Sequence, residues 1–275
     1  MKSSKTILIT GASSGIGRST VEVFSEKGWR VAATMRDPGK SQELAKLPGV
    51  KLYPLDVTDI QSIHACIEAV TRDFGKIDVL LNNAGYGAVG VFEAASPEQV
   101  QKQFDTNVFG VMNVTRAILP HFRKNRSGRI LTISSVGGRV TFPIYSLYHS
   151  TKWAVEGFME SLHYELRPLG IQAKLIEPGP IKTDFYGRSQ DLHLDKIPTD
   201  YKSYFDIAYS NSKKAGMNAE GPQVVANMIF KAATDSKNKL RYPVGGNAPA
   251  LIAIKRYLSE RLFFKIVRST IEKGL

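Results

Sequence analysis

The chain has 275 residues, of which 43% are hydrophobic and 23% charged, and its formal net charge is +12. This composition fits a globular protein in water with a sizeable core, either one large α/β domain or two small ones. Cys66 is the single cysteine, so an intrachain disulfide is excluded and a reducing, cytoplasmic location is expected. We expect no signal peptide and no membrane span, because no uncharged apolar run approaches ~20 residues.

Short apolar segments alternate with helical segments along the chain. The expected strands cover residues 5–10, 30–35, 50–54, 77–82, 129–134 and 171–176, with 240–244 as a candidate seventh. The expected helices run from the first turn to Lys27, from Asp59 to Phe74, over much of 96–125 and from about Tyr148 to Gly170. This alternation predicts an α/β fold with a parallel sheet of about seven strands and helices on both faces.

The first strand runs into a glycine-rich turn, Thr10-Gly11-Ala12-Ser13-Ser14-Gly15-Ile16-Gly17, which opens a helix. Gly11 allows a tight turn, and Gly15 and Gly17 let the backbone approach a pyrophosphate, which the helix N-terminus favours. A flexible loop is the alternative, since the spacing differs from the more common Gly-x-Gly-x-x-Gly. The position between a strand and a helix favours a dinucleotide site, and hence a Rossmann-type, doubly wound sheet.

The second strand ends in Ala33-Thr34-Met35-Arg36-Asp37. An acidic residue directly at this strand end would bind a ribose 2′-hydroxyl and repel a 2′-phosphate, but here Arg36 precedes Asp37. A guanidinium is a natural partner for the 2′-phosphate of NADP. We therefore expect NADP(H) rather than NAD(H), with a surface arginine paired to Asp37 as the alternative.

Further along the chain, Tyr148 and Lys152 are four residues apart and share one helix face. A free tyrosine titrates near ~10, and an ammonium one turn away is expected to lower the pKa of its phenol. Such pairs also occur on solvated helix faces. The pair therefore gains its meaning from the motifs that precede it.

Together these motifs resemble the short-chain dehydrogenase/reductase family over roughly Lys5 to Thr183. The segments Ala33–Asp37 and Ser135–Gly138 are similar to its 17β-hydroxysteroid and retinol dehydrogenase branch. The resemblance implies that Asn82-Asn83-Ala84-Gly85 supports the sheet and lines the cofactor ribose, that Asp56-Val57 contacts the adenine, and that residues 178–183 lie beside the nicotinamide. The implied cofactor contacts are Gly11, Ser13, Ser14, Gly15, Ile16, Gly17, Arg36, Asp56, Val57, Asn83, Ala84, Gly85, Tyr148, Lys152, Pro178, Gly179, Ile181 and Thr183.

The resemblance also implies catalytic roles. Tyr148 would exchange a proton with the substrate oxygen, and Lys152 would lower the tyrosine pKa and contact the nicotinamide ribose. Ser135 would hydrogen-bond the substrate oxygen; it is preferred to Ser134 because it lies thirteen residues before Tyr148, the family's usual spacing. Asn107 would hold a water that links Lys152 to solvent. Taken singly, Ser135 could instead cap a turn and Asn107 could satisfy a buried carbonyl.

The expected activity is an NADP(H)-dependent interconversion of an alcohol with a ketone or aldehyde; the alternative is a dinucleotide-binding regulator or scaffold without turnover. A bulky apolar substrate is expected, and apolar residues near the catalytic tyrosine and after Thr183 would either line its pocket or simply pack under a loop. These residues are Phe142, Ile144, Tyr145, Phe185, Tyr186, Tyr201, Tyr204, Phe205 and Tyr209. His149 and His163 have no cluster with metal-ligand spacing around them, so no catalytic metal is expected.

We expect one dinucleotide-binding catalytic domain over 1–275, with 184–220 as a substrate loop or lid and 248–275 as a C-terminal helical extension. In that extension an apolar stripe at helical spacing adjoins an excess of basic residues. The stripe is Leu251, Ile254, Leu258, Leu262 and Ile266. It could close the pocket, join subunits of a homo-oligomer or lie on a membrane; we expect a helix docked on its own core, with at most weak membrane contact.

The net charge is compatible with an anionic cofactor, an anionic membrane surface or solvated lysines that keep the protein soluble. Nucleic-acid binding would require a basic stripe with interleaved aromatic residues or a known module. The sequence shows neither, so no nucleic-acid partner is expected.

Overall fold

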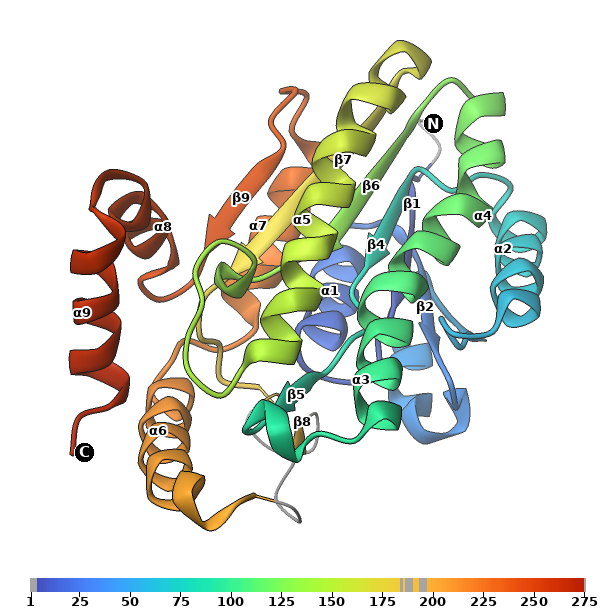
Figure 1. Ribbon diagram of the computed structural model, residues 1–275. Helices are drawn as coiled ribbons and strands as arrows, with labels where there is room; N and C mark the ends of the chain where they lie inside the picture. Colours follow the sequence, from blue (N-terminus) through green and yellow to red (C-terminus); the bar gives the residue numbers. More distant parts are fainter. Residues whose placement is uncertain (1–3, 184, 186–189, 193–196, 275) are drawn as a thin grey trace.

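The computed structural model describes residues 4–183, 185, 190–192 and 197–274, and its centre is a seven-stranded sheet (Figure 1). The strand order is β3-β2-β1-β4-β6-β7-β9, and neighbouring strands pair in parallel throughout. The strands are β1 (Thr6–Thr10), β2 (Arg30–Met35), β3 (Val50–Pro54), β4 (Val79–Asn82), β6 (Gly128–Ile133), β7 (Ile171–Pro178) and β9 (Arg241–Val244).

Helices cover both faces of this sheet, as Figure 1 shows. One face packs against α1 (Gly15–Glu26) and α7 (Gln223–Thr234), which share a buried apolar cluster with the strands. The other face packs against α2 (Ile60–Phe74), α4 (Gly110–Lys124) and α5 (Ser146–Leu166). The doubly wound, Rossmann-type fold expected from the sequence is confirmed.

Strand β1 shows why an uninterrupted apolar run suits this sheet. Ile7 and Ile9 belong to the cluster beneath α1 and α7, whereas Leu8 belongs to the cluster on the opposite face. All three side chains are fully buried. Because successive side chains of a strand point to opposite faces, each short run of aliphatic residues fills both layers of the core.

The loops that follow the strands meet at one edge of the sheet. The chain leaves β1 toward β2 on one side and leaves β4 toward β6 on the other, so the order reverses between β1 and β4. Parallel sheets bind ligands outside the carboxyl ends of their strands at such a reversal. Helix α5, expected to begin near Tyr148, begins at Ser146 and carries its first turn to this edge.

The remaining elements surround that edge. A parallel pair, β5 (Gly87–Val89) and β8 (Gln190–Leu192), and helix α6 (Thr199–Met217) lie beyond the carboxyl ends of the central strands (Figure 1). Helix α3 (Pro97–Phe104) continues through a π-helical turn, Asp105–Phe109, into α4. The 3₁₀ turns cover Pro38–Lys46, Phe92–Ala94, Val136–Gly138 and Arg167–Leu169.

The C-terminal extension forms two helices, α8 (Ala248–Tyr257) and α9 (Glu260–Ile271). Leu258, the C-cap residue of α8, has extended backbone angles (φ −87°, ψ 150°), and Ser259 is the N-cap residue of α9. A side-chain period that starts in α8 therefore does not continue in phase through α9.

The docked face of α9 differs from the expected stripe. Phe263 and Val267 are buried and pack with Val136 and Val140 beside the 3₁₀ turn after β6. The side chains of Leu262 and Ile266, which the expected stripe would turn toward the core, are 46% and 39% exposed. The helix is docked as expected, but through Phe263 and Val267, each one position after a predicted contact.

Candidate active site

Asn83 joins the loops that follow β1 and β4. Its Nδ2 donates to the carbonyl oxygens of Thr10 at 2.8 Å and Gly11 at 2.9 Å. The Thr10 hydroxyl accepts from the backbone N–H of Asn83 at 2.9 Å and of Ala84 at 3.0 Å. The sequence analysis did not single out Thr10, although a hydroxyl directly before Gly11 was an available indication.

The glycine-rich turn leaves little space for side chains. Gly11 and Gly15 have φ of +66° and +52°, where glycine is favoured. A Cβ on Gly17 would overlap the carbonyl oxygen of Gly11 and lie 2.6 Å from Asn83 Nδ2, and a Cβ on Gly11 would lie 2.8 Å from Ala84 Cα. Gly11 and Gly17 are therefore required by packing inside the protein, in addition to any approach of a ligand.

The start of α1 fits the phosphates of a dinucleotide. Ser14 is the N-cap residue, but its side chain makes no capping hydrogen bond to the described part of the chain, and the first turn contains no acidic residue. Backbone N–H groups at a helix start carry partial positive charge and bind anions. Ser13, Gly15 and Ile16, all expected cofactor contacts, lie at this helix start.

Arg36 lies just beyond the end of β2 and is exposed. Asp37 accepts from the backbone N–H of Gly39 at 3.0 Å and pairs with Lys40 at 3.3 Å. Within the described residues Arg36 has no hydrogen-bond or ion-pair partner, so the alternative of an Arg36–Asp37 pair is not what the structure contains. The guanidinium is available to an anionic ligand.

Asp56 and Val57 follow β3, one strand further out. Asp56 Oδ1 accepts from the backbone N–H of Thr58 at 2.9 Å and from its hydroxyl at 2.7 Å. Val57 is buried, and a Cβ on Gly110 would lie 2.8 Å from its Cγ2. The loop is thereby packed against the start of α4.

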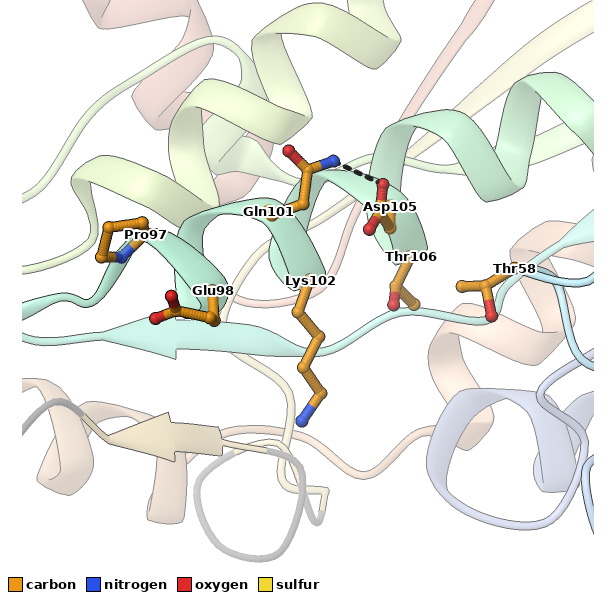
Figure 2. A pocket seen from close by; sticks show the side chains of 7 residues that line it. All are labelled: Thr58, Pro97, Glu98, Gln101, Lys102, Asp105 and Thr106. Atoms are coloured by element: carbon orange, nitrogen blue, oxygen red, sulfur yellow. Dashed lines mark hydrogen bonds between the residues drawn. The ribbon is translucent and has the colours of Figure 1, made fainter.

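An open groove of about 560 Å³ begins beside this loop (Figure 2). Its lining residues are Thr58, Pro97, Glu98, Gln101, Lys102, Asp105 and Thr106. None of the expected catalytic residues contributes to it. The groove therefore adjoins the expected adenine end of the site and lies away from Tyr148.

Ser135, Tyr148 and Lys152 come together between the end of β6 and the start of α5. Ser135 lies near the Tyr148 phenol and acts to lower its pKa, and Ser135 Oγ accepts from the backbone N–H of Gly137 at 3.0 Å. Lys152 Nζ lies 5.6 Å from the centroid of the Tyr148 ring and donates to the carbonyl oxygen of Ile133 at 2.8 Å. Of the two adjacent serines, Ser135 is the one that contacts the phenol.

The expectation that Lys152 lowers the pKa of Tyr148 is wrong for this structure. Burial raises the pKa of Tyr148 to about 12, and the hydrogen bond from Ser135 opposes this only in part. Burial also lowers the pKa of Lys152 to about 8, which the carboxylate of Glu156 opposes. Loss of water disfavours the charged form of both groups and is the largest cause of each shift.

Asn107 lies in the π-helical turn between α3 and α4 and is buried. Its Nδ2 donates to the carbonyl oxygen of Tyr86 at 2.9 Å and to Thr151 Oγ1 at 3.2 Å, and its Oδ1 accepts from the backbone N–H of Tyr86 at 3.1 Å. π-helical turns are rare and are often found at functional sites. Asn107 thus links the loop after β4 to the helix turn that carries Tyr148 and Lys152.

The segment after β7 returns toward the glycine-rich turn. The backbone N–H of Gly179 donates to the carbonyl oxygen of Val244 at 2.9 Å, and Ile181 is buried. A Cβ on Gly15 would lie 3.6 Å from Thr183 Cβ. The segment from Pro178 to Thr183 therefore runs along the site from the end of β7 to the start of α1.

An apolar cluster surrounds Tyr148, and the Phe185 ring centroid lies 5.2 Å from that of Tyr148. Members that the sequence analysis named are Phe142, Ile144, Tyr145, Phe185, Tyr204, Phe205 and Tyr209. Tyr201 is outside the cluster and exposed, and Tyr186 lies outside the described residues. The aromatic residues of α6 thus belong to the same cluster as Tyr148.

Ile144 has backbone angles that the sequence does not indicate. Its φ is +63°, a strained value for a β-branched residue, and its carbonyl oxygen accepts from the backbone N–H of Gly90 at 2.8 Å. Nearby, His149 Nδ1 accepts from the backbone N–H of Phe142 at 3.3 Å, and burial lowers the pKa of His149 to about 4. His149 is thereby a buried, neutral neighbour of the Tyr145 and Tyr148 rings.

A family model described as short chain dehydrogenase matches residues 5–192. The chain belongs to the short-chain dehydrogenase family. It is 40% identical over 252 residues to the uncharacterized oxidoreductase YusZ of Bacillus subtilis, covering 88% of this chain and 89% of that one. It is 37% identical over 247 residues to the 3-ketodihydrosphingosine reductase of Bacteroides thetaiotaomicron, covering 90% of each, and 36% identical over 252 residues to human retinol dehydrogenase 8, covering 86% and 80%.

Solved structures agree with this family. A short-chain dehydrogenase from Streptomyces avermitilis matches with a TM-score of 0.82 and 32% identity, covering 98% of this chain and 99% of that one. A short-chain dehydrogenase/reductase from Burkholderia phymatum in complex with NAD matches with a TM-score of 0.80 and 25% identity, covering 95% of each chain. ElxO with NADP bound matches with a TM-score of 0.74 and 27% identity, covering 90% of this chain and 99% of that one. The family member described here is an oxidoreductase near the retinol dehydrogenase branch that acts on CH–OH groups with a nicotinamide dinucleotide.

The described residues contain no group of three or more His, Cys, Asp or Glu side chains placed to hold a metal ion. Among the helices of the same residues, none combines the length and the apolar composition that a membrane span requires.

Proposed function

We propose that this short-chain dehydrogenase is an NADP(H)-dependent enzyme that interconverts a bulky apolar alcohol with the corresponding ketone or aldehyde. The observation that carries the proposal is the meeting of Ser135, Tyr148 and Lys152 at the switch point of the sheet, with an apolar cluster around the phenol. This arrangement combines a proton donor or acceptor with apolar surroundings, which is what a hydride-transfer reaction on an apolar substrate requires.

The proposed roles follow from these contacts. The glycine-rich turn and the segment from Pro178 to Thr183 would hold a nicotinamide dinucleotide, whose chemistry would be hydride transfer. The Tyr148 hydroxyl gives a proton to the substrate oxygen in reduction and removes it in oxidation. Ser135, which lies near that phenol, would hold the same oxygen and stabilise the charge that develops on it. Lys152 lies against the ring and would contact the nicotinamide ribose, and Asn107 anchors this helix turn through Thr151.

The preference for NADP(H) is part of the proposal. It is supported by the exposed guanidinium of Arg36 just after β2, while Asp37 is engaged by Gly39 and Lys40. An arginine at this position would form a charge-assisted pair with a 2′-phosphate. Ser13, Ser14 and the turn around them would hold the pyrophosphate at the start of α1, and Asp56 and Val57 would border the adenine.

The substrate class is inferred from the apolar cluster around Tyr148. Phe185 and Phe205 from the segment after β7 and Ile144 and Tyr145 from the loop before α5 contribute apolar surface next to Tyr148. Two relatives are named for apolar or long-chain substrates, a retinol dehydrogenase and a 3-ketodihydrosphingosine reductase. We propose that the chain is one catalytic domain in which residues 184–220 form the substrate loop. We also propose that the enzyme is cytoplasmic and has no nucleic-acid partner.

The test compares two tyrosine variants of the same cluster. Tyr148→Phe should lower kcat by on the order of 10²–10⁴-fold while NADPH affinity is kept, because only the proton-transfer group is removed. Tyr145→Phe is the control; it loses a hydroxyl that is 2.7 Å from Ser212 Oγ and should stay within about tenfold of the wild type. NADPH oxidation is followed with a panel of retinoid, steroid and long-chain ketones. A Tyr148→Phe enzyme with more than about a tenth of wild-type kcat would refute the proposal.

A further inference from the structure

One side of helix α6 belongs to the apolar cluster that contains Tyr148. Phe205 and Ala208 are buried in this cluster. From the next turn, Ser212 Oγ lies 2.7 Å from the hydroxyl of Tyr145, the N-cap residue of α5. Residues 205, 208 and 212 are three and four positions apart, so they share one face of the helix. This face is the part of α6 that borders the proposed substrate site.

A neighbouring side of α6 is bonded to the C-terminal end of α9 (Figure 1). The Tyr204 hydroxyl donates to Glu272 Oε1 at 3.1 Å. Asn211 Nδ2 donates to the carbonyl oxygens of Ile271 at 2.9 Å and Lys273 at 3.1 Å. Positions 204 and 211 are about two helical turns apart. The end of the chain therefore holds α6 at two points along its length.

The backbone at the end of α9 explains why an asparagine suits position 211. Ile271 is the last residue of α9, and the last carbonyl groups of a helix have no partner inside the helix. A side-chain amide has two N–H donors, so Asn211 reaches the carbonyl oxygens on both sides of Glu272. Helix α6 thus supplies the donors that the end of α9 lacks. We refer to residues 271–273 as the latch.

The side chain of Ile271 joins two apolar clusters. It packs against the cluster around Tyr148 and also against the cluster that docks α9 through Phe263. The second cluster includes Val136, which directly follows Ser135. The latch is therefore fixed on one side to the turn after Ser135 and on the other side to α6.

The bond between Tyr204 and Glu272 is partly shielded from water, because both residues are half-buried. Burial, and then the hydrogen bond to Glu272, raises the pKa of Tyr204, so the phenol keeps its proton and is the donor. A hydrogen bond to a charged acceptor is stronger than one between neutral groups. This contact therefore holds α6 more firmly than a neutral pair would.

We propose that the latch positions α6 as a wall of the substrate site, and that Tyr204 and Asn211 are positioning residues for a bulky apolar substrate. This inference rests on the proposed function, because it gives the latch a role in substrate binding. A wall that is fixed before the substrate arrives loses little conformational entropy on binding, so the affinity is higher. A role in stability alone predicts a different result, namely fewer folded molecules with unchanged affinity.

Hydrogen–deuterium exchange tests the latch without reference to activity. In Tyr204→Phe and Asn211→Ala the amides of α6 should exchange about two- to tenfold faster than in the wild type, because the lost hydrogen bond opposes opening by about that factor. The amides of α5 should keep their wild-type rates. Tyr257→Phe and Asn238→Ala are the matched controls, because Tyr257 is 80% exposed and Asn238 is exposed in the loop before β9. Wild-type exchange of α6 in both latch variants would overturn the inference.

Steady-state kinetics at saturating NADPH test the role in substrate binding. The substrate is the retinoid, steroid or long-chain ketone that the wild type reduces fastest. Tyr204→Phe and Asn211→Ala should raise its KM about two- to tenfold, while kcat and the dissociation constant of NADPH stay within about twofold of the wild type. The two control variants should keep the wild-type KM. A lower kcat at an unchanged KM is the result of a purely structural role and would exclude positioning.

A double-mutant cycle examines the bond itself. Glu272→Ala should raise KM about as much as Tyr204→Phe does, and the double variant should be no worse than either, because each change removes the same hydrogen bond. Additive effects would show that the two residues act through other contacts and would contradict the latch. If Asn211→Ala does not fold, this cycle decides.

The latch and the proposed function fail in different ways. An active Tyr148→Phe would remove the proposed function, while faster exchange of α6 in the latch variants would still stand as evidence for the latch. An inactive Tyr148→Phe together with unchanged exchange of α6 would remove only the latch.

Discussion

The region up to Thr183 and the region from Ile197 onward hold their parts in place by different means. In the first, backbone meets backbone: Gly11 and Gly17 have no space for a Cβ, and Asn83 bonds directly to main-chain oxygens. In the second, α6 is joined to the C-terminal segment by side-chain hydrogen bonds, such as Tyr204 to Glu272 at 3.1 Å. The first arrangement tolerates few substitutions, whereas the second can be altered residue by residue, as a change of substrate would require.

The largest effect is expected where the C-terminal region relies on one side chain. Phe263→Ala should lower the free energy of unfolding by about 3 kcal/mol, since Phe263 is buried against Val136 and Val140. Phe264→Ala is the matched control, because the Phe264 side chain is 45% exposed and its loss should cost about 0.5 kcal/mol or less. Urea unfolding measures both. Equal losses would show that α9 is not docked through Phe263.

A glycine pair tests the cofactor region. Gly17→Ala should cost about 1–3 kcal/mol and weaken NADPH binding about tenfold, because the new methyl group meets backbone that cannot move aside. Gly157→Ala on α5 has nothing within 4 Å of the new atom and should stabilise by about 0.5–1 kcal/mol. Thermal unfolding with and without NADPH gives both quantities. A Gly17→Ala protein with wild-type affinity would contradict the tight packing.

Arg36 is the exposed exception within the cofactor region. Arg36→Ala should weaken NADPH by about tenfold and leave NADH nearly unchanged, since a charge-assisted hydrogen bond is worth roughly 1.5–3 kcal/mol before solvent screening reduces it. Titration of both cofactors against the wild type and the variant measures the difference. Equal losses, or tighter NADH binding by the wild type, would remove the NADP preference.

The smallest effect is expected on the outer face of the C-terminal helices. Several basic residues of these helices lie next to large apolar side chains that are at least 39% exposed. The apolar residues are Ile254, Tyr257, Leu262, Phe264 and Ile266. Because α9 already docks its other face, sedimentation with phosphatidylserine vesicles should show only weak attachment that added salt abolishes. Arg261→Glu with Lys265→Glu is the charge-reversed control. Strong, salt-resistant binding of the wild type would contradict the docked arrangement.

The sequence predicted the sheet well because each strand carries its own apolar run. It also identified Ser135, Tyr148 and Lys152 as residues of one site, through a family resemblance that depends on their spacing in the sequence. It did not predict the pairing of β5 with β8, since each strand is three residues long and the two are about a hundred residues apart in the chain. Such a pairing is determined by tertiary contacts and leaves no local periodicity.

Two further expectations failed for identifiable reasons. The expected stripe from Leu251 to Ile266 requires one continuous helix. The break at Leu258 rotates the side chains of α9 relative to those of α8, so Phe263 and Val267 pack against the core. The pKa of Tyr148 was judged from its spacing to Lys152 alone. The structure shows that the loss of water dominates, and sequence spacing contains no information on that.

The Asn83 bridge has a consequence for how tightly the cofactor is held. Three hydrogen bonds from one residue already fix the loop after β1 to the loop after β4. A loop that is ordered before it meets its ligand loses little conformational entropy on binding, so most of the contact energy remains available as affinity. For Asn83→Ala we would therefore anticipate faster dissociation of the cofactor, although the side chain that is lost is bonded only to protein.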